Sequence, residues 1–219
     1  MNKLAVFDLD GTLAHTTPTL AEAMNIFLKS IGREEISREL MESFIGNGAR
    51  VLLTKVYEHF GLPREKNDID KALEGFFICY EKTYLDAEIY DGIGDALRML
   101  ADNGVMIGVL SNKPDKFVPP LVKKLFPDVQ MAFAVGQTER PRKPDPTVLL
   151  ELIEACGSDR ENCIYIGDSD VDIKTAKNAG VRSYAVSWGY RSKEALLSFD
   201  PDSIADTPEE FLNVLRNFI

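Results

Sequence analysis

The stretch Leu4-Ala5-Val6-Phe7-Asp8-Leu9-Asp10-Gly11-Thr12 decides the fold of this 219-residue chain. An uninterrupted apolar run that stops at Asp8 is typical of a short strand buried on both faces of a parallel sheet. Ligands of open α/β sheets bind at the carboxyl ends of the strands. Asp8 and Asp10 are therefore expected to point into the same crevice, with Gly11 permitting a tight turn after them. An ordinary turn after a strand uses the same residue types.

Similar apolar runs recur along the chain and predict further strands at 105–110, 131–135, 163–166 and 184–186. Between them, helical spacing of apolar residues predicts helices at 92–103, 147–156, 172–179 and 208–218. Strand alternating with helix is the pattern of an α/β protein. We expect a doubly wound, Rossmann-like parallel sheet with right-handed crossovers.

The segment 14–91 interrupts this alternation. Its apolar residues follow helical spacing at 19–31, 38–44, 49–60 and 69–85, and it shows no convincing strand. Helical sequence placed directly after the first strand predicts an inserted cap. We therefore expect a helical cap domain at 14–91 and an α/β core domain formed by 1–13 plus 92–219, with the return linker near 86–92.

The composition, with 45% hydrophobic and 27% charged residues, is that of an ordinary globular protein. A net charge of −10 disfavours nucleic acid and anionic membranes as partners. No apolar run approaches the ~18 residues of a membrane span. The cysteines, Cys79, Cys156 and Cys163, form no Cys-x-x-Cys pair and indicate no disulfide framework. We expect a cytoplasmic protein, a monomer or homodimer, with neither nucleic acid nor a membrane as partner.

A second acidic stretch, Gly167-Asp168-Ser169-Asp170-Val171-Asp172, follows the predicted strand at 163–166 and opens a helix. A helix cap needs only one carboxylate, and this stretch supplies more. If it lies beside Asp8 and Asp10, the carboxylates repel one another unless a cation is present. Oxygen ligands without His or Cys select a hard ion, Mg²⁺ before Zn²⁺. The only histidines, His15 and His59, have no partnering Cys, which argues against a zinc site or a Ser-His-Asp triad.

Two further predicted strand ends carry complementary groups. Val109-Leu110 runs into Ser111 and Asn112, a hydroxyl and an amide suited to hydrogen-bonding phosphate oxygens. Lys143 lies in a proline-bracketed loop whose restricted backbone would hold its cation steady. Taken singly, these residues are an ordinary turn and an ordinary surface lysine. Together with the two acidic stretches, they predict a site for phosphate chemistry.

These motifs resemble the haloacid dehalogenase-like superfamily, in the phosphatase branch with a helical cap after the first strand. The resemblance rests on Asp8-Leu9-Asp10-Gly11-Thr12, Ser111-Asn112, Lys143, and Gly167-Asp168 followed by Asp172. Within the superfamily, the likeness to phosphoglycolate phosphatases rests on Ile45-Gly46-Asn47-Gly48-Ala49-Arg50, Ser111-Asn112-Lys113-Pro114, Lys143-Pro144-Asp145-Pro146 and Trp188-Gly189-Tyr190. Two departures are His15-Thr16, where the family usually has an acidic residue followed by Ser, and Asp91, where a Pro often stands.

The resemblance implies an enzyme, a Mg²⁺-dependent phosphoric monoester hydrolase. Asp8 would attack phosphorus and become an aspartyl phosphate, while Asp10 would serve as general acid and then general base. Mg²⁺ would be held by Asp8, the backbone carbonyl of Asp10, and Asp168, with Asp172 as a supporting residue. The groups expected to hold the phosphate oxygens are Ser111, Asn112 and the catalytic Lys143, and Thr12 is also counted as substrate-binding.

The cap loop Gly46-Asn47-Gly48, with Arg50 nearby, could bind a small carboxylate, and a plain helix–helix turn explains the loop equally well. The implied reaction is hydrolysis of 2-phosphoglycolate to glycolate and phosphate. The alternatives are a phosphomutase acting on a sugar phosphate and a phosphatase for another small phosphate or pyrophosphate. A dehalogenase needs no leaving-group acid such as Asp10, and a non-catalytic phosphate-binding module would not need self-repelling carboxylates. The roles of His15 and Asp170 stay open.

Overall fold

The structure, a computed structural model, describes residues 1–219. The chain divides into two compact units, one formed by Met1–His15 with Ile89–Ile219 and the other by Thr16–Glu88. The first unit holds a parallel sheet with its covering helices. The second unit is built from helices.

Six strands form the sheet of the first unit. Their order is β5 (Met131–Gln137), β4 (Met106–Pro114), β1 (Leu4–Phe7), β6 (Cys163–Gly167), β7 (Arg182–Val186) and β8 (Ser203–Ala205). Every neighbouring pair is parallel, which confirms the predicted α/β fold class. The chain runs outward from β1 to β4 and β5, then crosses back to β6 on the other side of β1. The strand order therefore reverses beside β1, the kind of position at which such sheets bind ligands.

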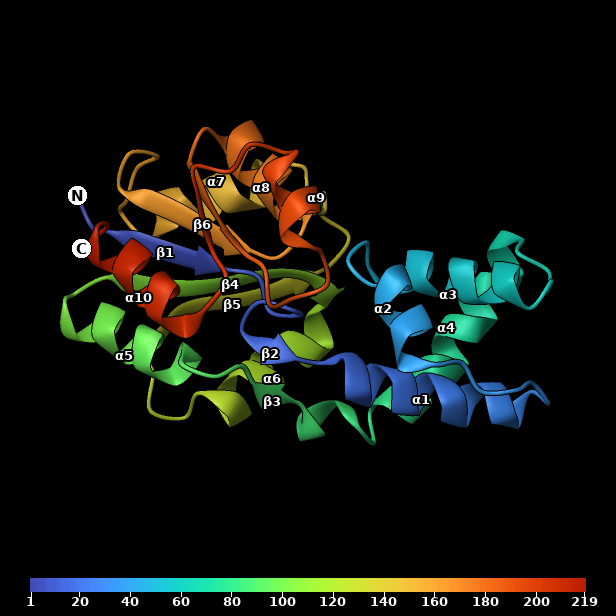
Figure 1. The fold of residues 1–219 in the computed structure, drawn as a ribbon. Helices are drawn as coiled ribbons and strands as arrows, with labels where there is room; N and C mark the ends of the chain where they lie inside the picture. Colours follow the sequence, from blue (N-terminus) through green and yellow to red (C-terminus); the bar gives the residue numbers. More distant parts are fainter. The chain divides into compact units, whose positions relative to one another are not determined.

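Helices cover both faces of this sheet (Figure 1). On one face lie α5 (Ile93–Asp102), α6 (Val118–Leu125) and α10 (Pro208–Arg216), and on the other α7 (Thr147–Ala155), α8 (Asp170–Ala179) and α9 (Lys193–Leu197). All residues of β1 are fully buried between the two layers. A strand enclosed in this way needs apolar side chains on both faces, which is why its sequence is continuously apolar.

Some elements differ from the sequence-based expectations. β4 continues to Pro114, so Ser111 and Asn112 lie within the strand rather than after it, and its register against β5 shifts between Leu110 and Pro114. The sequence pattern does not predict β8 or α6. β8 has only three residues, and α6 begins with prolines, which are tolerated in the first turn of a helix but obscure its pattern. α8 starts at Asp170, because Ser169 caps it.

The second unit contains α1 (Thr17–Ser30), α2 (Arg38–Phe44), α3 (Ala49–His59), α4 (Lys66–Tyr80) and the short 3-10 helix η1 (Tyr84–Asp86). Its interior includes Met24, Leu28, Leu53 and Phe76, all essentially buried. Buried residues three or four positions apart, such as Met24 and Leu28 in α1 or Ala72 and Phe76 in α4, give the longer helices one apolar stripe. β2 (Ala14–His15) and β3 (Glu88–Ile89) pair in a two-stranded sheet at the residues where the chain passes between the units, so the segment 14–91, expected to hold no strand, contains two short ones.

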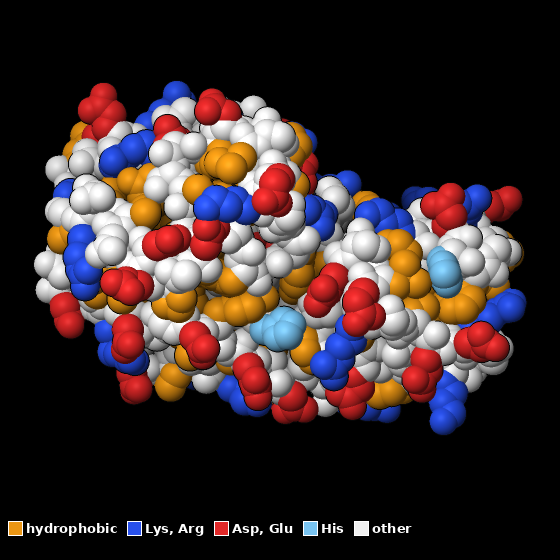
Figure 2. Space-filling model, viewed as in Figure 1, with side chains coloured by type: hydrophobic (Ala, Val, Ile, Leu, Met, Phe, Trp, Pro, Cys, Tyr) orange, Lys and Arg blue, Asp and Glu red, His pale blue; other side chains and the backbone are white.

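The surface matches the composition. Acidic and basic side chains are interspersed over the face shown in Figure 2, and no extended basic area is visible on it. None of the helices has both the length and the apolar character needed to cross a lipid bilayer.

Candidate active site

Three buried carboxylates, those of Asp8, Asp168 and Asp172, come together at the carboxyl ends of β1 and β6. One oxygen of each lies within 4.8 Å of the other two. They meet because β1 and β6 are parallel neighbours, with Phe7 paired to Ile166, so the loops that follow both strands leave the sheet at the same edge. The convergence expected from the sequence thus brings together three of the acidic residues that it singled out.

Burial dominates the electrostatics of this cluster. Burial raises the pKa of Asp8 to about 7, Lys143 opposes the rise, and the Asp172 carboxylate adds to it. Burial likewise raises the pKa of Asp168 well above its ordinary value, with the charges of Asp172 and Asp8 adding to the effect. Carboxylates that are both buried and mutually repelling are stabilised in their charged form by a hard cation.

Lys143 supplies a fixed positive charge beside the cluster. Its Nζ lies 2.7 Å from Asp172 Oδ1, 3.0 Å from Asp8 Oδ1 and 3.0 Å from the Tyr165 hydroxyl. Burial alone would lower the pKa of Lys143, but Asp172 and Asp8 outweigh it and hold this pKa well above its ordinary value. Lys143 is therefore a cation, and the Tyr165 hydroxyl, which also donates to Leu110 O at 2.8 Å, helps to fix it. The sequence gives no signal for Tyr165, because it reads as an ordinary core residue.

Asn112 supports Lys143 through the backbone. Its Nδ2 donates to Lys143 O at 3.1 Å, and Lys143 N donates to its Oδ1 at 3.0 Å. The amide expected to bind phosphate oxygens thus holds the lysine loop. Ser111 is buried at the same strand end, and its Oγ accepts a hydrogen bond from Lys113 N at 3.3 Å.

The Asp10 carboxylate is not one of the three clustered carboxylates, although its charge helps to raise the pKa of Asp8. It pairs with Lys113, whose Nζ lies 2.9 and 3.3 Å from its two oxygens. The predicted metal ligand at this position is the backbone carbonyl, so the side chain is available for another role. Lys113 belongs to a motif quoted from the sequence, but its spacing from Asp10 gives no hint of this contact.

Asp168 is enclosed by two loops. Thr12 Oγ1 donates to Asp168 Oδ1 at 3.1 Å, and Tyr190 N donates to Oδ2 at 2.8 Å. A Cβ at Gly11 or Gly189 would overlap the Asp168 carboxylate, so both loops need glycine to approach it. Thr12, expected to bind substrate, is fully buried, and its hydroxyl holds Asp168.

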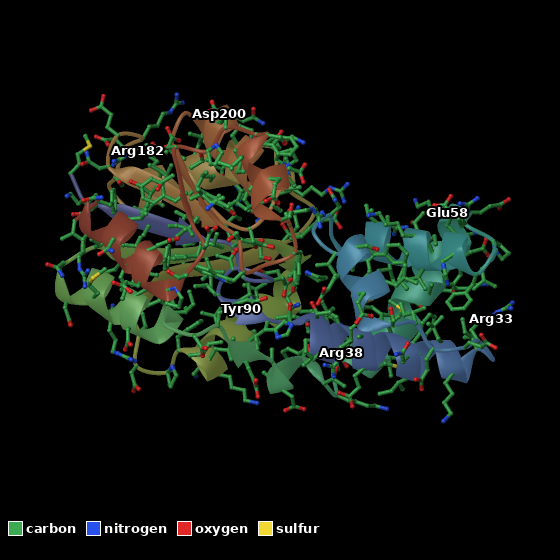
Figure 3. All side chains as sticks on the ribbon, in the orientation of Figure 1. Arg33, Arg38, Glu58, Tyr90, Arg182 and Asp200 are labelled. Carbon is green, nitrogen blue, oxygen red and sulfur yellow. The ribbon has the colours of Figure 1, made fainter.

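The remaining neighbours hold the loops that carry these groups. Trp188 Nε1 donates to Thr12 O at 3.2 Å. Tyr90, labelled in Figure 3, has its ring 6.4 Å from that of Trp188 and stacks on His15 at 5.5 Å. His15 of β2 therefore packs against the ring of Tyr90. Asp172 is also bound by Ser169, which donates from its N at 3.1 Å and its Oγ at 2.5 Å and so caps α8.

The predicted cap residues lie in the helical unit. Gly46 and Gly48 adopt positive φ values of 115° and 82°, and Gly48 is the N-cap of α3. Asn47 stands between these glycines. Arg50, in the first turn of α3, forms an ion pair with Asp70 of α4.

In the other unit, Asp170 pairs with Lys174 of the same helix at 2.7 Å and is not one of the three clustered carboxylates.

Comparison with known proteins identifies the class. The family model of haloacid dehalogenase-like hydrolases matches residues 5–186, and the chain belongs to this family. The predicted membership and the prediction of a hydrolase are thereby confirmed.

The similarity to individual relatives spans nearly the whole chain. The chain is 34% identical over 215 residues to phosphoglycolate phosphatase 1 of Pseudomonas aeruginosa, covering 96% of this chain and 78% of that protein. It is 32% identical to the phosphoglycolate phosphatase of Aliivibrio fischeri, covering 97% and 96%.

Solved structures show the same fold. The crystal structure of a predicted phosphoglycolate phosphatase from Haemophilus somnus superposes with a TM-score of 0.88 at 28% identity, covering 100% and 98% of the two chains. A haloacid dehalogenase-like family protein from Streptococcus pneumoniae, at 22% identity, shares the fold with a TM-score of 0.85 over 100% and 99%.

Proposed function

We propose that this protein is a Mg²⁺-dependent phosphatase that hydrolyses 2-phosphoglycolate to glycolate and phosphate. The observation that carries the proposal is the buried cluster of Asp8, Asp168 and Asp172 with Lys143 at the carboxyl ends of β1 and β6. The substrate comes from the relatives at 34% and 32% identity that are named phosphoglycolate phosphatases.

The donor set fits a hard divalent cation, because it is buried, composed of oxygen and crowded with negative charge. We assign Asp8, Asp168 and the backbone carbonyl of Asp10 as the protein ligands of Mg²⁺. When bound, the ion supplies positive charge that neutralises the phosphate oxygens. Asp172 supports the site through its contacts with Lys143 and Ser169.

Hydrolysis proceeds in two displacements. In the first, an oxygen of Asp8 bonds to phosphorus, the bond between phosphorus and the alkyl oxygen breaks, and Asp10 gives a proton to the departing oxygen. In the second, Asp10 takes a proton from water, the water oxygen bonds to phosphorus, and the acyl phosphate bond breaks to restore Asp8. Lys143 and Ser111 bind the phosphate oxygens, and Asn112 holds Lys143 in place.

The helical insertion 14–91 serves as a cap over the core formed by 1–13 and 92–219. A cap of this kind excludes water from the reacting groups. The backbone amides of Gly46, Asn47 and Gly48, together with Arg50, bind the carboxylate of the substrate. Arg50 then exchanges its partner Asp70, with which it forms a half-exposed ion pair, for the substrate.

The test compares substrates with and without a carboxylate. Arg50→Ala should lower kcat/KM for phosphoglycolate by about 10- to 150-fold, the value of one charge-assisted contact. The value of kcat/KM for ethyl phosphate, which has no carboxylate, should change little. Asp70→Ala is the matched control, because it removes the partner but keeps the guanidinium, and it should stay within about 3-fold of the wild type on both substrates.

Two results would overturn the substrate assignment. Equal losses on both esters would show that Arg50 supports the cap fold, and no loss on phosphoglycolate would show that Arg50 does not bind the carboxylate. Sustained release of inorganic phosphate separates a phosphatase from a phosphomutase, which returns the phosphoryl group to a sugar phosphate.

A further inference from the structure

We propose that Lys113 is a positioning residue for Asp10, the general acid and base of the proposed phosphatase reaction. This inference rests on the proposed function. Lys113 Nζ lies 2.9 Å from one oxygen of Asp10 and 3.3 Å from the other. Its side chain is 2% exposed and that of Asp10 is 15% exposed, so solvent screens the pair weakly. Contact with both oxygens restrains the rotation of the carboxylate as well as its position.

An irregularity in β4 places Lys113 at this point. The register against β5 shifts between Leu110 and Pro114. Irregularities of this kind redirect side chains and are frequent beside active sites. Within the shifted segment, Lys113 N donates to Ser111 Oγ, which further restrains the backbone that carries the lysine.

Gly136 of β5 packs closely against the same backbone. A Cβ at Gly136 would lie 2.6 Å from Lys113 O and 2.5 Å from Asp115 Cα, so only glycine allows this approach. Gly136 N also donates to Asp115 Oδ1 at 2.8 Å. Leu110 pairs with Val135 and Pro114 with Gln137, so the backbone on both sides of Lys113 is paired with the neighbouring strand and the sheet holds the lysine.

Two buried lysines contact different acidic groups of the site, and neither is bonded to Asp168, which Thr12 and Tyr190 hold. Lys143 contacts Asp8 and Asp172, whereas Lys113 contacts Asp10. Without Lys113, repulsion from the neighbouring Asp8 carboxylate would no longer be opposed by this cation, and the Asp10 carboxylate would turn away from Asp8. The leaving oxygen would then lack an aligned acid, while the nucleophile and the phosphate-binding groups would remain in place.

The experiment therefore varies the leaving group. Lys113→Met removes the charge and keeps the length, Lys113→Arg keeps the charge, and Lys116→Met changes an exposed neighbouring lysine as the control. Single-turnover phosphorylation is measured with 4-nitrophenyl phosphate, whose phenolate leaves without a proton, and with an alkyl phosphate that the wild type hydrolyses.

Lys113→Met should slow phosphoryl transfer from the alkyl phosphate by about 10- to 100-fold, which is part of the usual contribution of a general acid. It should change KM by less than about 3-fold. The rate with the aryl phosphate should fall by less than about 3-fold. Lys113→Arg, which keeps the charge, should recover part of the rate lost with the alkyl phosphate. In an Asp10→Asn background, adding Lys113→Met should cause no further loss, because both changes remove the same function. Gly136→Ala should produce the same dependence on the leaving group by moving the backbone of Lys113.

A second readout does not depend on turnover. The double variant Asp10→Asn/Lys113→Met should melt at a higher temperature than Lys113→Met, because it removes the carboxylate whose ion pair with Lys113 has been lost. Equal losses on both esters, a raised KM with unchanged kcat, or additive losses with Asp10→Asn would each overturn the proposal. If the wild type fails to prefer phosphoglycolate over ethyl phosphate, the substrate assignment fails, and the comparison of leaving groups still decides the role of Lys113.

Discussion

The environment of Asp8 bears on its proposed role as the nucleophile. It is buried at the end of β1, its Oδ1 accepts a hydrogen bond from Leu9 N at 2.7 Å, and Lys143 Nζ lies 3.0 Å from the same oxygen. Burial disfavours its charge, whereas Lys143 and a bound cation favour it. A charged oxygen with little water around it keeps its nucleophilic strength.

The first prediction concerns this residue. Asp8→Asn keeps the shape of the side chain but removes the attacking charge, so kcat should fall by several orders of magnitude. Steady-state release of phosphate measures the loss. Asp170→Asn is the control, because that carboxylate pairs with Lys174 outside the cluster, and it should stay close to the wild type. Near-normal turnover by Asp8→Asn would refute the covalent mechanism.

At the scale of elements, the turn after β1 and the loop after β7 close on Asp168 from two sides. Thr12 and Tyr190 each donate to one of its oxygens, and Trp188 binds Thr12 O, so the two loops are also bonded to each other. Gly11 and Gly189 allow this proximity. The loop that contains Trp188-Gly189-Tyr190 therefore acts as a support for a proposed metal ligand.

A glycine substitution tests that support. Gly189→Ala places a Cβ where Asp168 Oδ2 and Gly11 O now lie, and should weaken Mg²⁺ binding, measured by calorimetry, by about 10-fold or more. Gly94→Ala is the matched control, because its Cβ would meet only the end of the Arg98 side chain, at 3.5 Å. Unchanged Mg²⁺ affinity in Gly189→Ala would show that the loop does not position Asp168.

For the whole molecule, the cluster of carboxylates links folding to protons and cations. The pKa of Asp8 rises from 3.8 in an unfolded chain to about 7 in the metal-free fold. Between these values the folded protein holds the proton that the unfolded chain has lost. The contribution of Asp8 therefore lowers the free energy of unfolding as pH rises from about 4 to about 7. A cation reverses this penalty, because it binds the ionised carboxylate of the folded state.

Thermal unfolding should show this linkage. At a Mg²⁺ concentration of about 100 times Kd, the stabilisation is about 2.7 kcal/mol, which raises Tm by about 5–10 °C for a chain of this length. The rise in Tm caused by Mg²⁺ should be larger at pH 8 than at pH 6. At pH 6, about one unit below the pKa of Asp8, only about a tenth of this carboxyl is ionised and ready to bind the cation. Asp8→Asn should shrink both the rise and its pH dependence. Potassium chloride at matched ionic strength is the control, and an equal rise with it would contradict a specific site.

The class of fold and the residue types of the candidate site could both be predicted from the sequence. The apolar run at β1 and its alternation with helices predicted the parallel sheet, because buried strands must be continuously apolar. Asp8, Asp168 and Asp172 could be singled out because each follows a strand at a position where α/β sheets bind ligands. These are local properties, readable over a few neighbouring residues.

The tertiary structure alone decided which of these groups hold one another. Lys113 meets Asp10 across 103 positions of sequence, and Asn112 meets the backbone of Lys143 across 31. Such pairs depend on the order of the strands and on the register shift in β4, neither of which leaves a periodic signal in the chain. Thr12 and Asn112, both expected to be substrate ligands, therefore carry no sequence signal for the contacts that they make. Once folded, they fix Asp168 and Lys143, because a buried polar group takes the partner that the packing brings within reach.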